Sequence, residues 1–405
     1  MPAILVFVVF LVVLAFSVPI AVAMIAGSLA PIWITGVGGN VTQLVTNAFS
    51  GANSTPILAV PLFIFGGIIM AEGGISQKLF NFFAYFVGRF PGGVPCAVVI
   101  TCLFYGAISG SGPATAAAVG SMCIPFLVSL GYERKWSSGL IVVAGSLGVI
   151  LPGILIGLVL MIYCVIHCKR QGEDRDRINT SMKELHDMGL GHLFIDSFPA
   201  LLCPIIVLGG IYAGFVTPTE AACISVFYAL IVSLWVYKTI KLKDIWGIMV
   251  TAVRTYGGLA FVLAFATAFG RVLSLTGASA AIINFITSTF GEAWIALTFC
   301  MILFLILGMV MDTGPAIIIL APILLPAMEA LGVDPVHFGV ILVCCLAIGL
   351  ATPPFGLNLF VVSNLSGEKP MDIAAKAIPF IISFLVALVL IVYVPWFSTF
   401  LYLGQ

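Results

Sequence analysis

The amino-acid sequence predicts an all-α polytopic membrane protein, built from two repeats of inverted topology with two re-entrant helical hairpins and broken spans. Hydrophobic residues make up 62% of the chain and charged residues only 8%, whereas soluble domains carry about 25% charged residues. Continuous apolar runs of about 20 residues, enough to cross a bilayer, recur along the chain. A transmembrane barrel would need alternating segments of about 10 residues instead. Two similar stretches in the two halves indicate the repeat.

The first apolar run, Ile4–Ala26, is expected to be one retained membrane span. No Lys or Arg precedes it, since the first basic residue is Lys78. A secretory signal peptide carries a basic region ahead of its apolar segment, so this run does not resemble one. The net charge is zero and no basic run is long, which argues against nucleic acid as a partner.

The cysteines and histidines give no sign of metal or redox chemistry. Ten cysteines are scattered without CxxC spacing, so neither a zinc site nor a disulfide framework is expected. We interpret the cysteines as small apolar fillers. Four histidines are too few to suggest haem ligation, and HExxH is absent. The sequence therefore does not predict an enzyme.

The stretch Gly106–Ala114 reads GAISGSGPA and interrupts an apolar run. Glycines let the backbone turn sharply and expose its carbonyls, and Pro113 stops a helix. Ser109, Ser111 and Thr115 add neutral oxygens, which suit a hard cation such as sodium. A small-residue packing seam between helices is the structural alternative.

The stretch Gly308–Ala316 reads GMVMDTGPA and repeats this pattern 202 residues later, and Pro125 pairs with Pro326. Gly/Pro-interrupted apolar segments at matching positions of two halves are typical of a transporter's binding site. Asp312 adds a carboxylate in mid-membrane, which is unfavourable unless partnered. We interpret it as a cation ligand or an anchor for the hairpin backbone, with a helix cap as the alternative.

A third interruption, Ala351–Asn358, reads ATPPFGLN. Its two consecutive prolines remove helical hydrogen bonds, so the span should unwind after Leu350. Thr352 and Asn358 would then complete an oxygen cage opposite the hairpin. A purely structural kink is the alternative.

The first half lacks a counterpart of this interruption. Gly148 matches Gly349 at a shift of 201, but Leu151–Gly153 already resembles the region around Pro379 at a shift of 227. About 26 residues of the second copy are therefore missing from the first, and what remains is too long for one span and too short for two. We expect the native polypeptide to carry an extra stretch between Ile150 and Gly153.

A polar connection, residues 169–192, separates the two halves. Its basic residues place it in the cytoplasm, and Lys238, Lys241 and Lys243 agree two spans later. Part of it, Arg177–Met188, is either an amphipathic surface helix or a solvated linker. Residues 1–168 would then form the first repeat, with its hairpin near 106–130. Residues 193–405 would hold the connecting spans and the second repeat, with its hairpin near 308–331.

Two isolated charges have separate interpretations. Glu220 follows Thr217-Pro218, a pattern that resembles a helix N-terminus, so we expect a structural role. Arg271 lies in an apolar run. It either attracts an anionic substrate or extends to the membrane interface.

Five motifs together resemble the large membrane subunit of tripartite ATP-independent periplasmic (TRAP) transporters, over essentially the whole chain. They are PLFIFGGIIMAEGGIS (Pro61–Ser76), SGSGPATAAAVG (Ser109–Gly120), GFVTPTEAA (Gly214–Ala222), GMVMDTGPAIIILAPILLP (Gly308–Pro326) and GLATPPFGLNLFV (Gly349–Val361). The family usually continues with a Pro-Pro-Ser stretch after the equivalent of Val149-Ile150, and this chain does not.

The resemblance implies sodium-coupled uptake of an organic acid anion, such as sialic acid or a C4-dicarboxylate, by an elevator motion in the bacterial inner membrane. It implies Na⁺ as coupling ion and two protein partners besides membrane lipid: a small four-span membrane subunit and a periplasmic substrate-binding protein. With the residue arguments above, the expected sodium ligands are Ser109, Gly110, Ser111, Gly112, Asp312, Thr313, Gly314, Thr352 and Pro353. The expected substrate contacts are Ser109, Ser111, Thr115, Arg271 and Asn358.

Three other classes of protein were compared with this interpretation. A membrane anchor of a respiratory complex should show paired histidines in its spans, and an intramembrane protease a nucleophile and base in matching spans; neither is evident. A stand-alone sodium/dicarboxylate symporter with similar hairpins remains open, because only the specific motifs and the need for a binding protein distinguish it.

Overall fold

The computed structural model describes residues 2–16, 18–53, 55–149 and 153–400, and all regular structure in these ranges is helical. Eight of the described helices are long and apolar enough to cross a membrane, or nine if the bent pair α4–α5 counts as one span. The predicted all-α polytopic membrane class is therefore confirmed.

The first half forms ten α-helices and one short 3₁₀ segment, η1. They are α1 (Pro2–Ala15), α2 (Ile20–Thr35), α3 (Val41–Ala52), α4 (Thr55–Glu72), α5 (Ile75–Val87), α6 (Gly93–Ser109), α7 (Gly112–Ser129), α8 (Arg134–Ser146), η1 (Leu147–Val149), α9 (Gly153–Gln171) and α10 (Arg175–Asp187).

The remaining chain begins with two connecting helices and a π-helical turn, η2, and continues into the second repeat. These elements are α11 (Leu190–Tyr212), α12 (Pro218–Ile231), η2 (Val232–Val236), α13 (Asp244–Leu275), α14 (Ala278–Phe290), α15 (Ala293–Val310), α16 (Thr313–Ala330), α17 (Pro335–Gly349), α18 (Leu357–Ser366), α19 (Pro370–Tyr393) and α20 (Trp396–Thr399).

The prediction of one span over Ile4–Ala26 is wrong. The chain breaks between α1 and α2, which pack against each other. Pro19 immediately precedes α2, and a proline lacks the N–H that a continuing helix would need. The apolar pattern alone did not reveal this break, because residues on both sides of it are equally hydrophobic.

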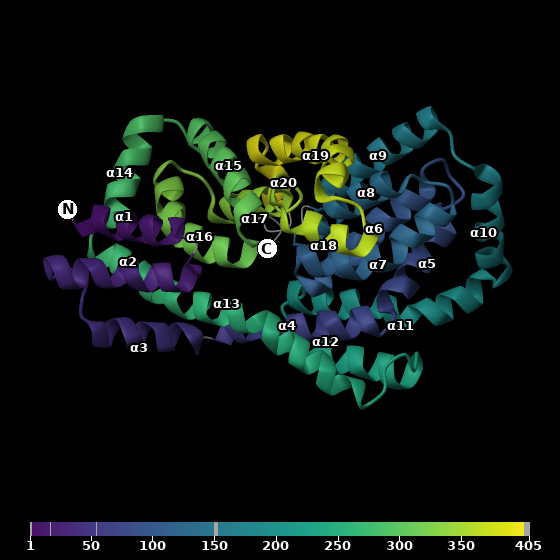
Figure 1. Ribbon diagram of the computed structural model, residues 1–405, viewed down its shortest axis with the longest axis horizontal. Helices are drawn as coiled ribbons and strands as arrows, with labels where there is room; N and C mark the ends of the chain where they lie inside the picture. The colour runs from purple at the N-terminus through teal and green to yellow at the C-terminus, as the bar shows by residue number, and fades with distance from the viewer. Residues whose placement is uncertain (1, 17, 54, 150–152, 401–405) are drawn as a thin grey trace.

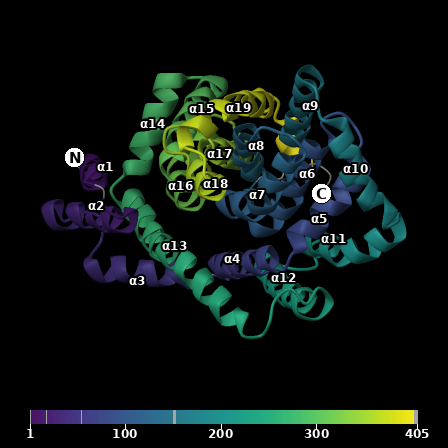
Figure 2. The same cartoon turned by 45° about the vertical axis from the view of Figure 1, so that its right-hand side comes forward.

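The two halves interlock rather than lying side by side as separate bundles. α10 and α14 lie toward opposite ends of the long axis, while α13 runs diagonally past α4 and α12 (Figures 1 and 2). α13 packs on α2, α3 and α4, whereas α18 packs on α7 and α8 of the first half. The second half therefore supplies part of the environment of the first hairpin.

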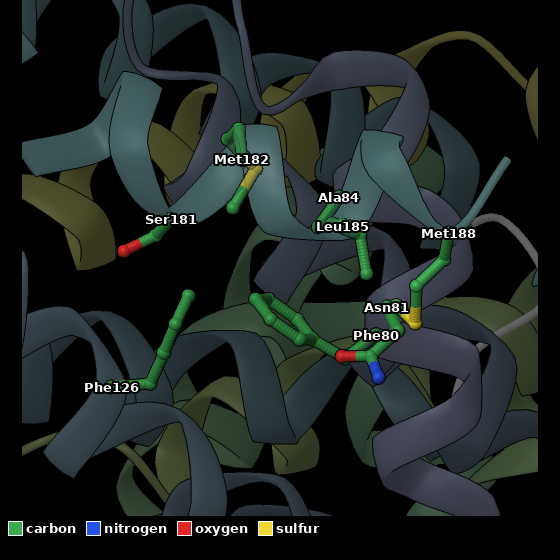
Figure 3. A pocket seen from close by; sticks show the side chains of 8 residues that line it. All are labelled: Phe80, Asn81, Ala84, Phe126, Ser181, Met182, Leu185 and Met188. Carbon is green, nitrogen blue, oxygen red and sulfur yellow. The ribbon is translucent and has the colours of Figure 1, made fainter.

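The polar connection folds onto the first half through α10. Leu185 and Met182 are buried and face Phe80 and Phe126 across a cavity of about 270 Å³ (Figure 3). The ring of His186 stacks on Tyr85 with centroids 4.1 Å apart. Of the two alternatives, the structure therefore shows an amphipathic helix, and its apolar side packs on protein.

Glu173 fixes the start of this connection. Its carboxylate is almost buried and accepts hydrogen bonds from the Gly92 backbone N–H, at 3.0 Å, and from the Tyr132 hydroxyl. It also pairs with Arg175 at 2.8 Å. Gly92 precedes α6 and Tyr132 follows α7. Glu173 therefore joins the two ends of the first hairpin that lie opposite its tip.

Two smaller expectations are also confirmed. Thr217 and Glu220 form a capping box at the start of α12, which is the structural role expected of Glu220. All ten cysteines are free, and nine of them are buried, as expected of apolar fillers.

Candidate functional site

The first hairpin turns at Gly110 and Ser111, between α6 and α7. Gly110 adopts a left-handed conformation with φ of 62°, which favours glycine. Ser111 is the N-cap of α7, and its hydroxyl accepts a hydrogen bond from the Ala114 N–H at 3.4 Å. The glycine and serine predicted to form the tip therefore do so.

Three oxygens converge at this tip. The hydroxyls of Ser109 and Thr115 lie 2.9 Å apart, and the Thr115 hydroxyl donates to the Ser111 carbonyl at 2.9 Å. The Ser109 hydroxyl lies 3.4 Å from the same carbonyl. Both side chains are buried, with exposed fractions of 4% and 0%. We call these three atoms the oxygen triangle; oxygen atoms are the ligands that hard cations take.

Asn358 of α18 forms a wall beside this hairpin. A Cβ placed on Gly112 would lie 3.2 Å from Leu350 Cδ1 and 3.5 Å from Asn358 Nδ2. The Asn358 amide is fully buried and donates to the Val142 carbonyl at 3.1 Å and to the Ser146 hydroxyl at 3.0 Å. The residues predicted from the two halves are thus brought together.

The amide oxygen of Asn358 is the second feature of this wall. This atom, Oδ1, is buried and makes no hydrogen bond within the part of the chain that the structure describes. A buried acceptor without a partner is unfavourable by about 1–3 kcal/mol. The free oxygen therefore offers a further ligand position on the side of the tip that Gly112 occupies.

A pair of close glycine contacts supports each hairpin. A Cβ on Gly106 would lie 1.9 Å from Gly148 Cα, and one on Gly349 would lie 2.5 Å from Gly308 Cα. Gly106 matches Gly308 and Gly148 matches Gly349 in the sequence repeat. The same backbone contact therefore holds the first hairpin against η1 and the second hairpin against the last residue of α17, and only glycine fits there.

The second hairpin turns at Met311 and Asp312, between α15 and α16. Asp312 is the N-cap of α16, and its Oδ1 accepts a hydrogen bond from the Thr313 N–H at 2.7 Å. The cap that was the alternative interpretation is thus present, and the second carboxylate oxygen has no hydrogen bond among the described residues. Gly314 follows in α16 and has open space where a Cβ would be.

The break at Ala351–Gly356 separates α17 from α18, as the double proline predicts. The Thr352 hydroxyl donates back to the Ile348 carbonyl at 2.8 Å, and the Asn358 N–H donates to the Leu350 carbonyl at 3.0 Å. Pro353 is joined to Pro354 by a cis peptide bond. The break therefore turns the chain so that Asn358 reaches the first hairpin.

Arg271 is not brought to either hairpin tip. α13 meets the second hairpin where Leu259, Val262 and Leu263 face Gly314 across a small apolar cavity. Arg271 lies eight residues beyond Leu263, about 12 Å further along the helix. It lines a separate pocket with Gln43 and Asn47 of α3.

Two residues at the first hairpin were missed. Ser146 receives the Asn358 amide, and the buried Tyr105 hydroxyl donates to the Gly67 carbonyl at 2.8 Å, which ties α6 to α4. Ser146 lies two residues before Gly148, which matches Gly349 in the sequence repeat. This position was the one sequence feature that could have predicted a role for Ser146. Tyr105 gave none, because an aromatic residue in an apolar helix does not identify its partner.

The family model described as "Tripartite ATP-independent periplasmic transporter, DctM component" matches residues 7–154 and 149–397. The isethionate TRAP transporter permease protein DctMQ of Oleidesulfovibrio alaskensis is 37% identical over 419 residues, which cover 96% of this chain and 64% of that protein. The C4-dicarboxylate TRAP transporter large permease protein DctM of Pseudomonas aeruginosa is 33% identical over 384 residues, covering 88% of each chain.

Among solved structures, the YdaH transporter of Alcanivorax borkumensis, whose crystal structure "reveals an unusual topology", has a TM-score of 0.58 at 13% identity. The match covers 88% of this chain and 87% of that one. At this identity the likeness shows a shared fold.

Proposed function

Because this chain belongs to the DctM-component family of tripartite ATP-independent periplasmic transporters, we propose that it carries out sodium-coupled uptake of a small organic acid anion by an elevator motion. The chain is a multi-pass inner-membrane permease and not an enzyme. The proposal concerns the coupling ion, the cargo and the motion.

The single observation that carries the sodium proposal is the oxygen triangle next to Asn358. Two buried hydroxyls and a carbonyl lie within 3.4 Å of one another, and a free amide oxygen points to the same helix N-terminus. We assign sodium to the two hairpin tips and the adjoining break. The proposed ligands are Ser109, Ser111, Thr115, Asp312, Thr313 and Thr352, with Gly110, Gly112, Gly314 and Pro353 shaping the backbone around them.

The anion would bind beside the first sodium position. The start of α7 presents the Gly112 N–H and the positive end of the helix dipole. Ser109, Ser111, Thr115 and Asn358 surround this position. A cation next to an anion is nearly neutral, so the loaded protein crosses the membrane more easily than with either ion alone. The membrane potential adds about 2.3 kcal/mol per charge per 100 mV.

The proposed cargo is a small organic acid anion, in the range from C4-dicarboxylates to sialic acid. The two relatives are named for isethionate and for C4-dicarboxylates, both of which are small anions. The family is tripartite, and we propose that the two other components are a small four-span membrane subunit and a periplasmic substrate-binding protein. The chain spans 64% of the isethionate relative's length.

We also propose that about 26 residues belong between Ile150 and Gly153. This position includes residues 150–152, which lie outside the described part of the chain. Two findings support it: the family model matches in two pieces that overlap at 149–154, and the alignment with the isethionate relative has 419 positions for a chain of 405 residues. Sequencing the encoding DNA tests it, and an uninterrupted reading across this point would remove the proposal.

The test of the function is uptake by the complete membrane complex in proteoliposomes. Labelled succinate, isethionate and sialic acid are offered with or without an inward sodium gradient and with or without the binding protein. Uptake that needs both would support the proposal. Uptake that needs sodium alone would favour a stand-alone symporter, and uptake that ignores sodium would contradict the coupling.

Asp312→Ala gives a site-specific version of this test. Asp312 is the only carboxylate at either tip, so we expect the substitution to abolish sodium-dependent uptake while membrane insertion stays normal. Insertion is measured by the yield of folded protein in the membrane. Normal uptake by this variant would exclude Asp312 from the coupling site.

A further inference from the structure

We propose that Arg271, Gln43 and Asn47 form a carboxylate-binding site at the periplasmic end of the protein, separate from the hairpin tips. The site would hold the organic anion before it reaches the first hairpin. This biological role rests on the proposed transport function, whereas the binding chemistry rests on the pocket alone.

The pocket forms because α3 and α13 pack in a defined antiparallel register. A Cβ on Gly51 would lie 2.4 Å from Thr267 Oγ1, so the two helices pack closely at this point. One turn away from this contact, Asn47 faces Arg271. A further turn brings Gln43 level with Leu275, and all four of these residues line a pocket of about 300 Å³.

The third side of the pocket is the loop between α2 and α3. Gly38 and Gly39, with φ of 108° and 96°, also line the pocket. Gly38 is buried, and a Cβ there would lie 3.4 Å from Val272. The loop therefore rests directly on α13, so all three sides of the pocket come from packed elements that lie beside one another (Figure 1).

The polar groups of the pocket are mainly hydrogen-bond donors. Gln43 Oε1 accepts from the Asn40 N–H at 3.3 Å, which leaves the Gln43 amide N–H₂ free to donate. The Asn47 side chain makes no hydrogen bond within the described ranges. Arg271 adds the planar guanidinium fork that fits a carboxylate in two parallel hydrogen bonds.

The charge of Arg271 is not balanced by any carboxylate in the described part of the chain. Among the residues that the structure describes, no carboxylate lies within 4.0 Å of its guanidinium, and its side chain is exposed. An unpaired arginine beside two amides attracts an anion from solution. Of the two interpretations of Arg271 left open by the sequence, this geometry favours the anion site over simple extension to the interface.

The position of the pocket gives it access to the periplasm. α13 begins just after Lys238, Lys241 and Lys243, a basic cluster that marks the cytoplasmic side. The helix has 32 residues, and Arg271 lies in its last two turns. The pocket is therefore at the opposite surface, about 12 Å along α13 from the level of the second hairpin.

The test measures binding without transport. Purified protein in detergent is dialysed against labelled succinate in sodium-free choline buffer, so that sodium-dependent binding at the hairpins is silent. We expect saturable binding that weakens with ionic strength and falls at least tenfold in Arg271→Gln. Arg254→Gln, which removes another exposed arginine of α13, should bind like the parent.

A second variant keeps the arginine. Asn47→Asp places a carboxylate opposite Arg271, so it should compete with succinate and weaken binding about as much as Arg271→Gln. Absence of sodium-free succinate binding in the parent, or equal binding in the parent and in Arg271→Gln, would overturn the proposal.

Uptake measurements separate this proposal from the proposed function. Arg271→Gln should raise the KM for the anion several-fold and leave the sodium dependence and maximal rate unchanged. If sodium coupling is absent in all variants, the proposed function fails while the binding result still stands. If Arg271→Gln weakens only the association with the periplasmic binding protein, the pocket is a protein contact and the carboxylate site is overturned.

Discussion

The two hairpins share a sequence pattern and a supporting glycine contact, yet their tips have different surroundings. At the first tip, Gly112 packs against Leu350 and Asn358 from the other half of the chain. At the second tip, the matching Gly314 has open space. A repeated motif therefore reproduces the hairpin, whereas the wall that completes its tip comes from the opposite repeat.

The missing wall has a simple origin in the chain. α18 covers α7 and α8, and by the repeat its counterpart would follow η1 and cover α16 and α17. Only residues 150–152 separate η1 from α9, which is too few for a helix. If the proposed segment of about 26 residues belongs between Ile150 and Gly153, its absence accounts for the open second tip.

The largest expected effect comes from restoring this segment. We expect a chain that carries the aligned segment of a close relative between Ile150 and Gly153 to transport at least tenfold faster than the 405-residue chain, because the second tip would gain its wall. Sodium-driven uptake in proteoliposomes measures it. As a control, a Gly/Ser stretch of the same length should give no gain, and equal rates for all three chains would contradict the comparison.

Removing the existing wall is the reverse experiment. Asn358→Leu removes the two hydrogen bonds that the amide donates to the Val142 carbonyl and to the Ser146 hydroxyl, so we expect a loss of about 2 kcal/mol in unfolding free energy. Ser146→Ala removes one partner and should lose about 1 kcal/mol. Thermal unfolding in detergent measures both, and a stability of Asn358→Leu equal to the parent's would show that this wall does not support the hairpin.

Alanine substitutions at the matched glycines Gly112 and Gly314 should change the unfolding free energy in opposite directions. A Cβ on Gly112 meets Leu350 at 3.2 Å, so Gly112→Ala should destabilise the protein by about 1 kcal/mol. A Cβ on Gly314 would have no neighbouring atom within 4 Å, so Gly314→Ala should stabilise α16 by about 0.5 kcal/mol. The same unfolding assay compares them, and equal effects would mean that the two tips are equally packed.

The smallest expected difference in unfolding free energy is between variants that remove the helix caps at the two tips. Ser111 accepts its capping bond at 3.4 Å, whereas Asp312 accepts at 2.7 Å. We expect Ser111→Ala to lower the unfolding free energy by about 0.5 kcal/mol and Asp312→Ala by about 1 kcal/mol. A larger loss for Ser111→Ala would indicate that its hydroxyl has a partner beyond the cap.

Much of the fold and of the first tip was predictable from local chemistry. Glycine, proline and hydroxyl patterns placed both tips and the break before Asn358, because each residue type acts on its own backbone. The break between α1 and α2 and the partners of Asn358 were not predictable in this way. Both features depend on packing between helices that are distant in the sequence. The same packing places Arg271 against α3 and away from the hairpins.

The most direct test of the account is the sodium affinity of the first tip. Thr115→Val removes one oxygen of the oxygen triangle and preserves the side-chain shape. Thr101→Val changes another buried threonine of the same hairpin, whose hydroxyl bonds, among the described residues, to the Ala97 carbonyl alone. The account predicts that the sodium concentration for half-maximal uptake rises at least tenfold in Thr115→Val and stays constant in Thr101→Val. An unchanged value in Thr115→Val would contradict sodium binding at the first hairpin.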